Sequence, residues 1–176
     1  CEEFPDFNFA VLLQKFALQS KIAGLVVPDP YHSISDLNRL QLMCEYLKSK
    51  KILLIDRDGT MNKKAPQGEY ITDWTQFEWI PETRQAMKNL AKEGFQFIVI
   101  TNQAGIARKM IDPDNLEKIH QNMIEELAAE GVEVLKVYMS PHHWDENSFM
   151  RKPSPGMFFQ AAKEYKIRMD RCPFIG

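Results

Sequence analysis

From Lys51 onward, the sequence alternates short apolar runs with longer amphipathic stretches. The run 52–55 contains only isoleucine and leucine, and further, mostly apolar runs cover 95–100, 134–139 and 174–175. A continuous apolar run of this length is typical of a strand that is buried on both faces of its sheet. Strands that alternate with helices predict an α/β fold, here a Rossmann-like parallel sheet with flanking helices.

The amphipathic stretches carry signals for the ends of helices. One helix is expected after Pro81, with Gly94 as its stop, and a second from Asp112, an N-cap residue followed by proline. A third is expected with Ser154 as cap and Pro155 at its first position. Ligands bind beyond the carboxyl ends of strands in such sheets, so functional residues are sought there.

Residues 1–50 have a different pattern, and we expect a mostly helical N-terminal segment with helices over 7–22 and 37–47. No chemistry-bearing motif occurs in this segment. The stretch from Tyr31 to Leu40 faintly resembles the tail of sugar-nucleotidyltransferase domains, which implies a fused nucleotidyltransferase domain before it. We therefore divide the chain into 1–50 and a second domain, 51–176.

Net charge, cysteine content and the length of the apolar runs indicate which partners and which cellular compartment to expect. The net charge of −2 gives no electrostatic reason to expect a nucleic-acid or membrane partner. Three widely separated cysteines, Cys1, Cys44 and Cys172, predict reduced thiols in a cytoplasmic protein. The apolar runs are shorter than the ~20 residues of a membrane helix. Both ends look cut, so we expect a piece of a longer protein.

Two carboxylates follow the first predicted strand. Asp56 and Asp58 are two residues apart, so on an extended chain they point the same way, and Gly59 permits a sharp turn. Adjacent carboxylates repel unless a cation lies between them, and Mg²⁺ is the natural candidate. A carboxylate can also attack phosphorus. The plainer interpretation of this pattern alone is an Asp-Gly turn with a capping aspartate.

Two further polar groups follow later predicted strands. Thr101 and Asn102 end the second, where a hydroxyl and backbone N–H groups suit a phosphate oxygen. Arg151 and Lys152 come after the third, next to a helix start, where a lysine can neutralise phosphate. Either group alone is more often a turn or solvated charge. All three sites in order, each after a predicted strand, favour a phosphate-handling site.

In these three motifs the chain resembles the haloacid dehalogenase superfamily over about 51–176. The segments 101–106 and 151–157 resemble more narrowly the heptose bisphosphate phosphatase and histidinol-phosphate phosphatase subfamilies. The resemblance implies that Asp56 attacks phosphorus, that Asp58 is the general acid and base, and that Asp56 and the Asp58 carbonyl bind Mg²⁺. It also implies phosphate contacts by the catalytic residues Thr101 and Lys152. Four residues are expected to help in substrate binding: Gly59, Thr60, Asn102 and Arg151.

The sequence departs from this superfamily at two places. A fourth-motif aspartate, a magnesium ligand, is expected directly after Gly176, where the sequence given stops. Many relatives also carry a Cys-x-His…Cys-x-Cys zinc loop, whose positions here are Ser140, His142, Ser148 and Met150. Four good N or S donors are needed for structural zinc, so we expect no zinc. His142 and the neighbouring His143 are interpreted as ordinary surface-loop residues, and His120 has no partner signature.

Three functions remain open from the sequence. The first is an Mg²⁺-dependent phosphatase for a small phosphorylated metabolite, most simply a heptose bisphosphate. The second is a polynucleotide 3′-phosphatase, which the balanced charge of 51–176, with 17 Lys or Arg against 18 Asp or Glu, disfavours. The third is a catalytically weakened structural or regulatory module of a bifunctional protein.

Overall fold

The computed structural model describes residues 9–23, 34–46, 48 and 50–176. It divides into two units, Cys1–Lys48 and Ser49–Gly176, each considered by itself. The described part of the first unit contains α1 (Phe9–Leu18) and α2 (Leu37–Tyr46). Both helices fall inside the predicted ranges. The residues from Tyr31 to Ser33, at the start of the nucleotidyltransferase-like stretch, lie outside the described residues, and so does Cys1.

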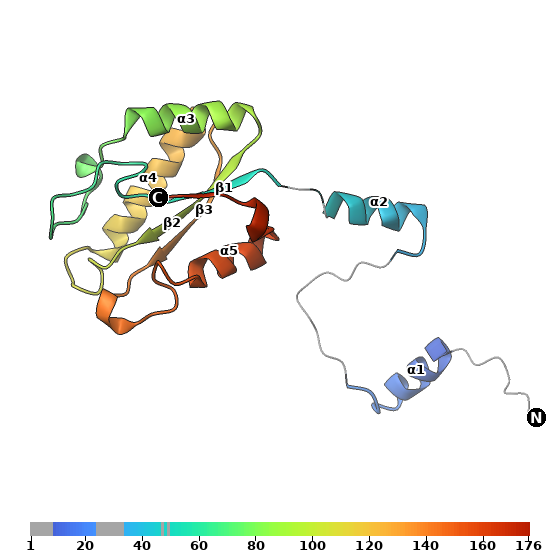
Figure 1. The fold of residues 1–176 in the computed structure, drawn as a ribbon. Coiled ribbons are helices and arrows are strands. Elements are labelled where there is room, and N and C mark those ends of the chain that lie inside the picture. Colours follow the sequence, from blue (N-terminus) through green and yellow to red (C-terminus); the bar gives the residue numbers. More distant parts are fainter. Residues whose placement is uncertain (1–8, 24–33, 47, 49) are drawn as a thin grey trace, which may run out of the picture. The chain divides into compact units, whose positions relative to one another are not determined.

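The second unit is built on a four-stranded sheet (Figure 1). Its strands are β1 (Ile52–Ile55), β2 (Gln96–Asn102), β3 (Val134–Ser140) and β4 (Phe174–Ile175), in the spatial order β3-β2-β1-β4. Every pair is parallel. The predicted α/β fold with a parallel sheet is therefore confirmed. The carboxyl ends of β1 and β2, the two central strands, lie side by side, as the predicted site requires.

Helices cover both faces of this sheet. Figure 1 shows α3 (Pro81–Lys92) and α5 (Gly156–Tyr165) on opposite sides, with α4 (Pro113–Ala129) behind the strands. Side chains alternate between faces along a strand, so each strand contributes to two cores. Leu53 and Ile55 pack into the core on the α3 and α4 side, and Ile52 and Leu54 into the core on the α5 side.

The helix ends agree with the sequence in two of three cases. Asp112 caps α4, accepting a hydrogen bond from the Asp114 N–H at 2.9 Å, and α3 begins at Pro81. The prediction that Ser154 caps the third helix is wrong. Its N–H donates to the Arg151 carbonyl at 2.8 Å in a turn, which leaves Pro155 as the cap and Gly156 as the first helical residue.

Three short 3₁₀ helices complete the second unit: Trp74–Gln76, Trp144–Glu146 and Met169–Arg171. The exposed Cys44 and the buried Cys172 are both free thiols. Among the described residues, no helix combines the length and apolar character needed to cross a membrane.

Candidate active site

Asp56 and Lys152 meet at the carboxyl edge of the sheet. The Asp56 N–H donates to the Ile175 carbonyl at 2.8 Å, which holds the end of β1 against β4. Lys152 Nζ lies 2.7 Å from Asp56 Oδ1 and donates to the Ile100 carbonyl at 2.7 Å. Asp56 Oδ1 also accepts from the Arg57 N–H at 2.7 Å. Both contacts use Oδ1, so within the described part of the chain Oδ2 is left for an incoming group.

Asn102 fixes the backbone of Lys152. Its Oδ1 accepts from the Lys152 N–H at 3.0 Å, and its Nδ2 donates to the Lys152 carbonyl at 3.1 Å. The end of β2 is thereby joined to the segment before α5, 50 residues further along the chain. Because both polar atoms of Asn102 are used this way, the structure gives this residue a positioning contact. Its expected role in substrate binding stays a prediction.

Asp58 is held by four hydrogen-bond donors from three side chains. Arg57 donates from Nη2 to Oδ2 at 2.9 Å and from Nε to Oδ1 at 3.2 Å. Asn62 Nδ2 donates to Oδ1 at 3.1 Å, and Gln103 Nε2 to Oδ2 at 2.7 Å. Burial alone would raise the pKa of the Asp58 carboxyl, but the Arg57 charge and these hydrogen bonds hold the pKa below its ordinary value.

Arg57 is buried and bridges Asp58 to α4. Its side chain is 1% exposed, and its Nη1 lies 3.0 Å from Nε2 of His120. Burial first, and the Arg57 charge second, lower the pKa of His120 to about 3, so the imidazole is neutral near pH 7. A guanidinium has no acceptor, so Nε2 accepts and Nδ1 carries the proton.

Gln103 connects the first two motifs. Its Nε2 donates to Thr101 Oγ1 at 2.8 Å as well as to Asp58, and its backbone N–H donates to the Ser140 carbonyl at 2.7 Å. Thr101 and Gln103 are both buried. The Thr101 hydroxyl therefore has an accepting contact already, and its own proton is free to be donated to another group.

The turn after Asp58 needs a glycine. Gly59 has φ +87°, in the left-handed region that other residues rarely adopt, and its N–H donates to the Asn62 carbonyl at 2.8 Å. The Thr60 N–H donates to the Arg57 carbonyl at 3.3 Å. This turn brings Asn62 back onto Asp58. The substrate contacts expected of Gly59 and Thr60 stay predictions.

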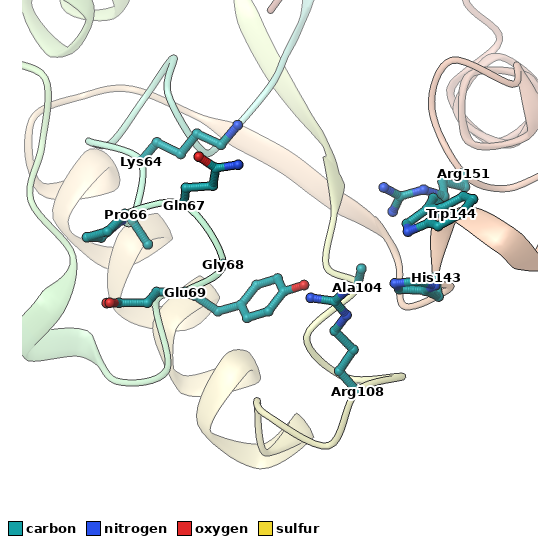
Figure 2. Close-up of a pocket in the computed structure, with 12 residues that line it drawn as sticks. Lys64, Pro66, Gln67, Gly68, Glu69, Ala104, Arg108, His143, Trp144 and Arg151 are labelled. Atoms are coloured by element: carbon teal, nitrogen blue, oxygen red, sulfur yellow. The ribbon is translucent and has the colours of Figure 1, made fainter.

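A cavity of about 430 Å³ adjoins this site (Figure 2). Figure 2 shows Lys64 on one side of it, with Arg108 and Arg151 on the other. A smaller cavity of about 110 Å³ lies against Asp58. The two share four lining residues, so they adjoin; these are Lys64, Ala65, Glu69 and Tyr70. Residues of the segment 64–71 therefore line the space beside Asp58.

His143 also lines the larger cavity, and this differs from the surface-loop interpretation. Its side chain is only 18% exposed, and its Nδ1 lies 2.6 Å from Asp145 Oδ1. His142 pairs with Glu146 instead, with 3.0 Å between Nδ1 and Oε2. The burial of His143 depends on the tertiary placement of its loop, which no local pattern indicates. The expected absence of zinc stays a prediction.

The oxygen donors present suit a magnesium ion. Asp56 Oδ2 and the Asp58 backbone carbonyl are hard oxygen ligands, and Mg²⁺ commonly binds through one or two carboxylates plus water and substrate phosphate. Among the described residues, no group of three or more His, Cys, Asp or Glu side chains could form an all-protein cage. That Asp56 and the Asp58 carbonyl bind Mg²⁺ stays a prediction.

The structure brings together most of the residues that the sequence singled out. Asp56 and Lys152 are in direct contact, while Asp58 and Thr101 are joined through Gln103. Four further residues of the site received no role from the sequence: Arg57, Asn62, Gln103 and His120. Arg57 could have been suspected, because a cationic residue directly between two motif carboxylates is placed to neutralise their charge.

The parallel sheet and this group of side chains define the chain as haloacid dehalogenase-like. Residues 51–176 match the family described as "Polynucleotide kinase 3 phosphatase", and the chain belongs to this family. The predicted membership of the haloacid dehalogenase-like phosphatases is therefore confirmed.

Curated relatives and solved structures carry a more specific name. D-glycero-beta-D-manno-heptose-1,7-bisphosphate 7-phosphatase of Bordetella bronchiseptica is 34% identical over 128 residues, covering 72% of this chain and 69% of that protein. The corresponding alpha-heptose enzyme of Mycobacterium tuberculosis is 34% identical over 105 residues, covering 60% of this chain. The chain spans 55% of that enzyme's length.

The heptose bisphosphate phosphatase of B. bronchiseptica has also been solved in complex with magnesium and phosphate. It superimposes with a TM-score of 0.67 at 31% identity, covering 72% of this chain and 69% of that one.

Proposed function

We propose that this chain is the catalytic domain of a Mg²⁺-dependent phosphatase that hydrolyses a small sugar bisphosphate, a heptose bisphosphate, through an aspartyl-phosphate. The observation that carries the proposal is the contact between Asp56 and Lys152, with Asp58 close by, at the carboxyl edge of the sheet. The names of the relatives support the substrate class.

In the first half-reaction, Asp56 Oδ2 attacks the phosphorus and the bond from phosphorus to the leaving oxygen breaks. Lys152 keeps Oδ1 turned away, at 2.7 Å from Nζ, so that Oδ2 faces the substrate. The lysine charge and the Thr101 hydroxyl stabilise the phosphoryl oxygens. Asp58 gives a proton to the leaving oxygen, which departs as an alcohol. Because the side chains that donate to Asp58 favour its ionised carboxylate, Asp58 has to take up this proton when the substrate binds, where the charge of the phosphate opposes a second anion nearby.

In the second half-reaction, Asp58 takes a proton from water, and the water oxygen attacks the phosphorus. The bond between phosphorus and Asp56 Oδ2 breaks, which releases phosphate and restores the carboxylate. The donors from Arg57, Asn62 and Gln103 favour the ionised form of Asp58 that this step needs. A bound Mg²⁺ would neutralise charge on the phosphoryl oxygens and on Asp56.

The larger cavity suits the rest of a bisphosphate substrate. Three cationic side chains line it, from Lys64, Arg108 and Arg151, against one acidic residue, Glu69. Guanidinium groups bind phosphate in bidentate geometry. Arg151 is held by a hydrogen bond from Nη1 to the His142 carbonyl at 3.0 Å, which leaves its other donors for a ligand. The cationic lining of this cavity therefore supports the proposal that the second phosphate of the substrate binds here.

A polynucleotide 3′-phosphatase is the second candidate, favoured by the description of the matching family. The phosphoryl-transfer chemistry would be the same. The charge of 51–176 is balanced, at 17 basic against 18 acidic residues, whereas a DNA-binding face requires an excess of basic residues. The sugar bisphosphate therefore remains the preferred substrate.

The experiment that tests the proposal is phosphate release in Mg²⁺ from heptose bisphosphates, histidinol phosphate and a 3′-phosphorylated oligonucleotide. We expect release from a heptose bisphosphate, none after chelation with EDTA, and none from the Asp56→Asn variant. Preferred release from the oligonucleotide, weakened by salt, would replace the first candidate by the second. No release from any substrate would leave two explanations: the fourth-motif aspartate expected after Gly176 is needed, or the chain is a non-catalytic module. A chain extended beyond Gly176 would distinguish them.

A further inference from the structure

The side chain of His120 is buried, although sequence reasoning gave it no role. It is 5% exposed and belongs to α4, which supplies no residue to the proposed chemistry. A buried histidine needs partners for its ring nitrogens, because an unpaired buried polar atom is costly. Its Nε2 has a partner in Arg57 Nη1, at 3.0 Å.

The Arg57 guanidinium has hydrogen-bond partners on two sides. Nε and Nη2 donate to the Asp58 carboxylate, with both oxygens engaged, and Nη1 points to His120. The planar guanidinium has fixed donor directions, so an acceptor on one side determines the direction of the donors on the other. His120 is that acceptor, because a neutral imidazole with its proton on Nδ1 presents a lone pair at Nε2.

We propose that His120 and Arg57 are positioning residues that aim the Asp58 carboxylate for proton transfer in the reaction proposed above. His120 contacts neither the substrate nor the reacting atoms and acts through the Arg57 guanidinium. A displaced general acid or base loses much of its effect, because proton transfer requires hydrogen-bond distance to the reacting oxygen.

Leaving groups of different acidity separate this role from simple stabilisation of the fold. An alkyl phosphate, such as a sugar phosphate, needs a proton from Asp58 on its leaving oxygen. An aryl phosphate such as p-nitrophenyl phosphate releases a stable phenolate without that proton. A misdirected Asp58 should therefore reduce kcat/KM for the alkyl phosphate far more than for the aryl phosphate.

The test compares His120→Leu, His120→Gln and the parent chain with both substrates. Leucine removes the acceptor, whereas the glutamine side-chain oxygen can replace it. We expect His120→Leu to lower kcat/KM for the sugar phosphate by about 100-fold, with little change for p-nitrophenyl phosphate. His120→Gln should restore most of the loss. Ile119→Val, a core change on the same helix, controls for packing and should leave the ratio between the substrates unchanged.

Equal losses with both substrates in His120→Leu, or a failure of glutamine to rescue, would overturn the proposal. If the parent chain hydrolyses neither substrate, the proposed function is not supported for this chain, and a second measurement still tests the contact on which the positioning role rests. Nitrogen-15 NMR of the parent chain should show His120 in the Nδ1–H tautomer, with Nε2 unprotonated near neutral pH. Protonation at Nε2 would contradict the contact with Arg57 on which the inference rests.

Discussion

Among the individual residues of the site, Asn102 makes contacts that a single mutation can remove. Its side-chain amide makes two hydrogen bonds to the Lys152 backbone, and Lys152 in turn contacts Asp56. The position of the Lys152 amine, which we propose contacts phosphate, therefore depends on a neighbour that need not touch the substrate. An amide is suited to this, because it offers one acceptor and one donor to a single peptide unit.

Asn102→Ala should destabilise the chain and weaken phosphate binding together. The Lys152 N–H and carbonyl lose their partners, and we expect a loss of about 1–3 kcal/mol in the free energy of unfolding. Urea unfolding and the inhibition constant of inorganic phosphate measure the two effects. Asn89→Ala, at an exposed position of α3, is the control and should change neither. A raised KM with unchanged stability would instead make Asn102 a direct substrate contact.

Sequence patterns single out residues that lie in a motif after a strand. Asp56, Asp58, Thr101 and Lys152 each come after a recognisable apolar run, and the structure brings them to one edge of the sheet. Their catalytic roles stay predictions. His120 was missed because its partner, Arg57, is 63 residues away, and a single histidine on a helix carries no local signal of such a contact.

At the scale of elements, the start of α5 depends on one glycine. A Cβ on Gly156 would lie 2.5 Å from the Phe149 carbonyl oxygen, which is backbone and cannot simply rotate away. The Gly156 N–H donates to that same oxygen at 3.0 Å. The close approach holds the segment 149–156, which carries Arg151 and Lys152, against the first turn of α5.

Gly156→Ala should therefore move this segment, although alanine has the higher helix propensity. We expect a loss of about 1–3 kcal/mol in unfolding free energy and a drop in kcat, since Lys152 shifts relative to Asp56. Differential scanning calorimetry and steady-state kinetics would measure this. Gln160→Ala, exposed on the same helix, should stay within about 0.5 kcal/mol. A more stable Gly156→Ala variant would contradict the close approach.

The sequence predicts those elements and helix ends whose signals are local. It fails where a helix end depends on contacts made only in the folded chain. Apolar runs located all four strands, and the Asp112–Pro113 pair located the start of α4. The residue type and position of Ser154 predict a helix cap. In the folded loop, however, the Ser154 N–H donates to the Arg151 carbonyl in a turn, which the local sequence does not indicate.

At the scale of the whole molecule, the buried His120 makes stability depend on pH. Its pKa is about 3 when folded and about 6.5 when unfolded. Between these values the unfolded chain binds a proton that the folded chain does not. The contribution of His120 to the free energy of unfolding is therefore complete above about pH 6.5 and is lost progressively as the pH falls toward 3.

His120→Gln should remove this part of the pH dependence. The parent chain should lose stability, relative to the variant, by at most about 1.4 kcal/mol per pH unit below pH 6.5. Urea unfolding of both proteins at pH 7, 6 and 5 gives the difference directly, because carboxylate contributions are common to both. Parallel curves across that range would show that His120 titrates normally in the folded protein.

The central claim is that Asp56 becomes covalently phosphorylated, and an acid-quenched reaction tests it most directly. The chain is mixed with Mg²⁺ and a heptose bisphosphate, quenched within the first turnover, digested and analysed by peptide mass spectrometry. The account predicts phosphate on Asp56 in the parent chain, and neither phosphopeptide nor phosphate release in Asp56→Asn. Phosphate release without a modified Asp56, and with activity retained in Asp56→Asn, would contradict it.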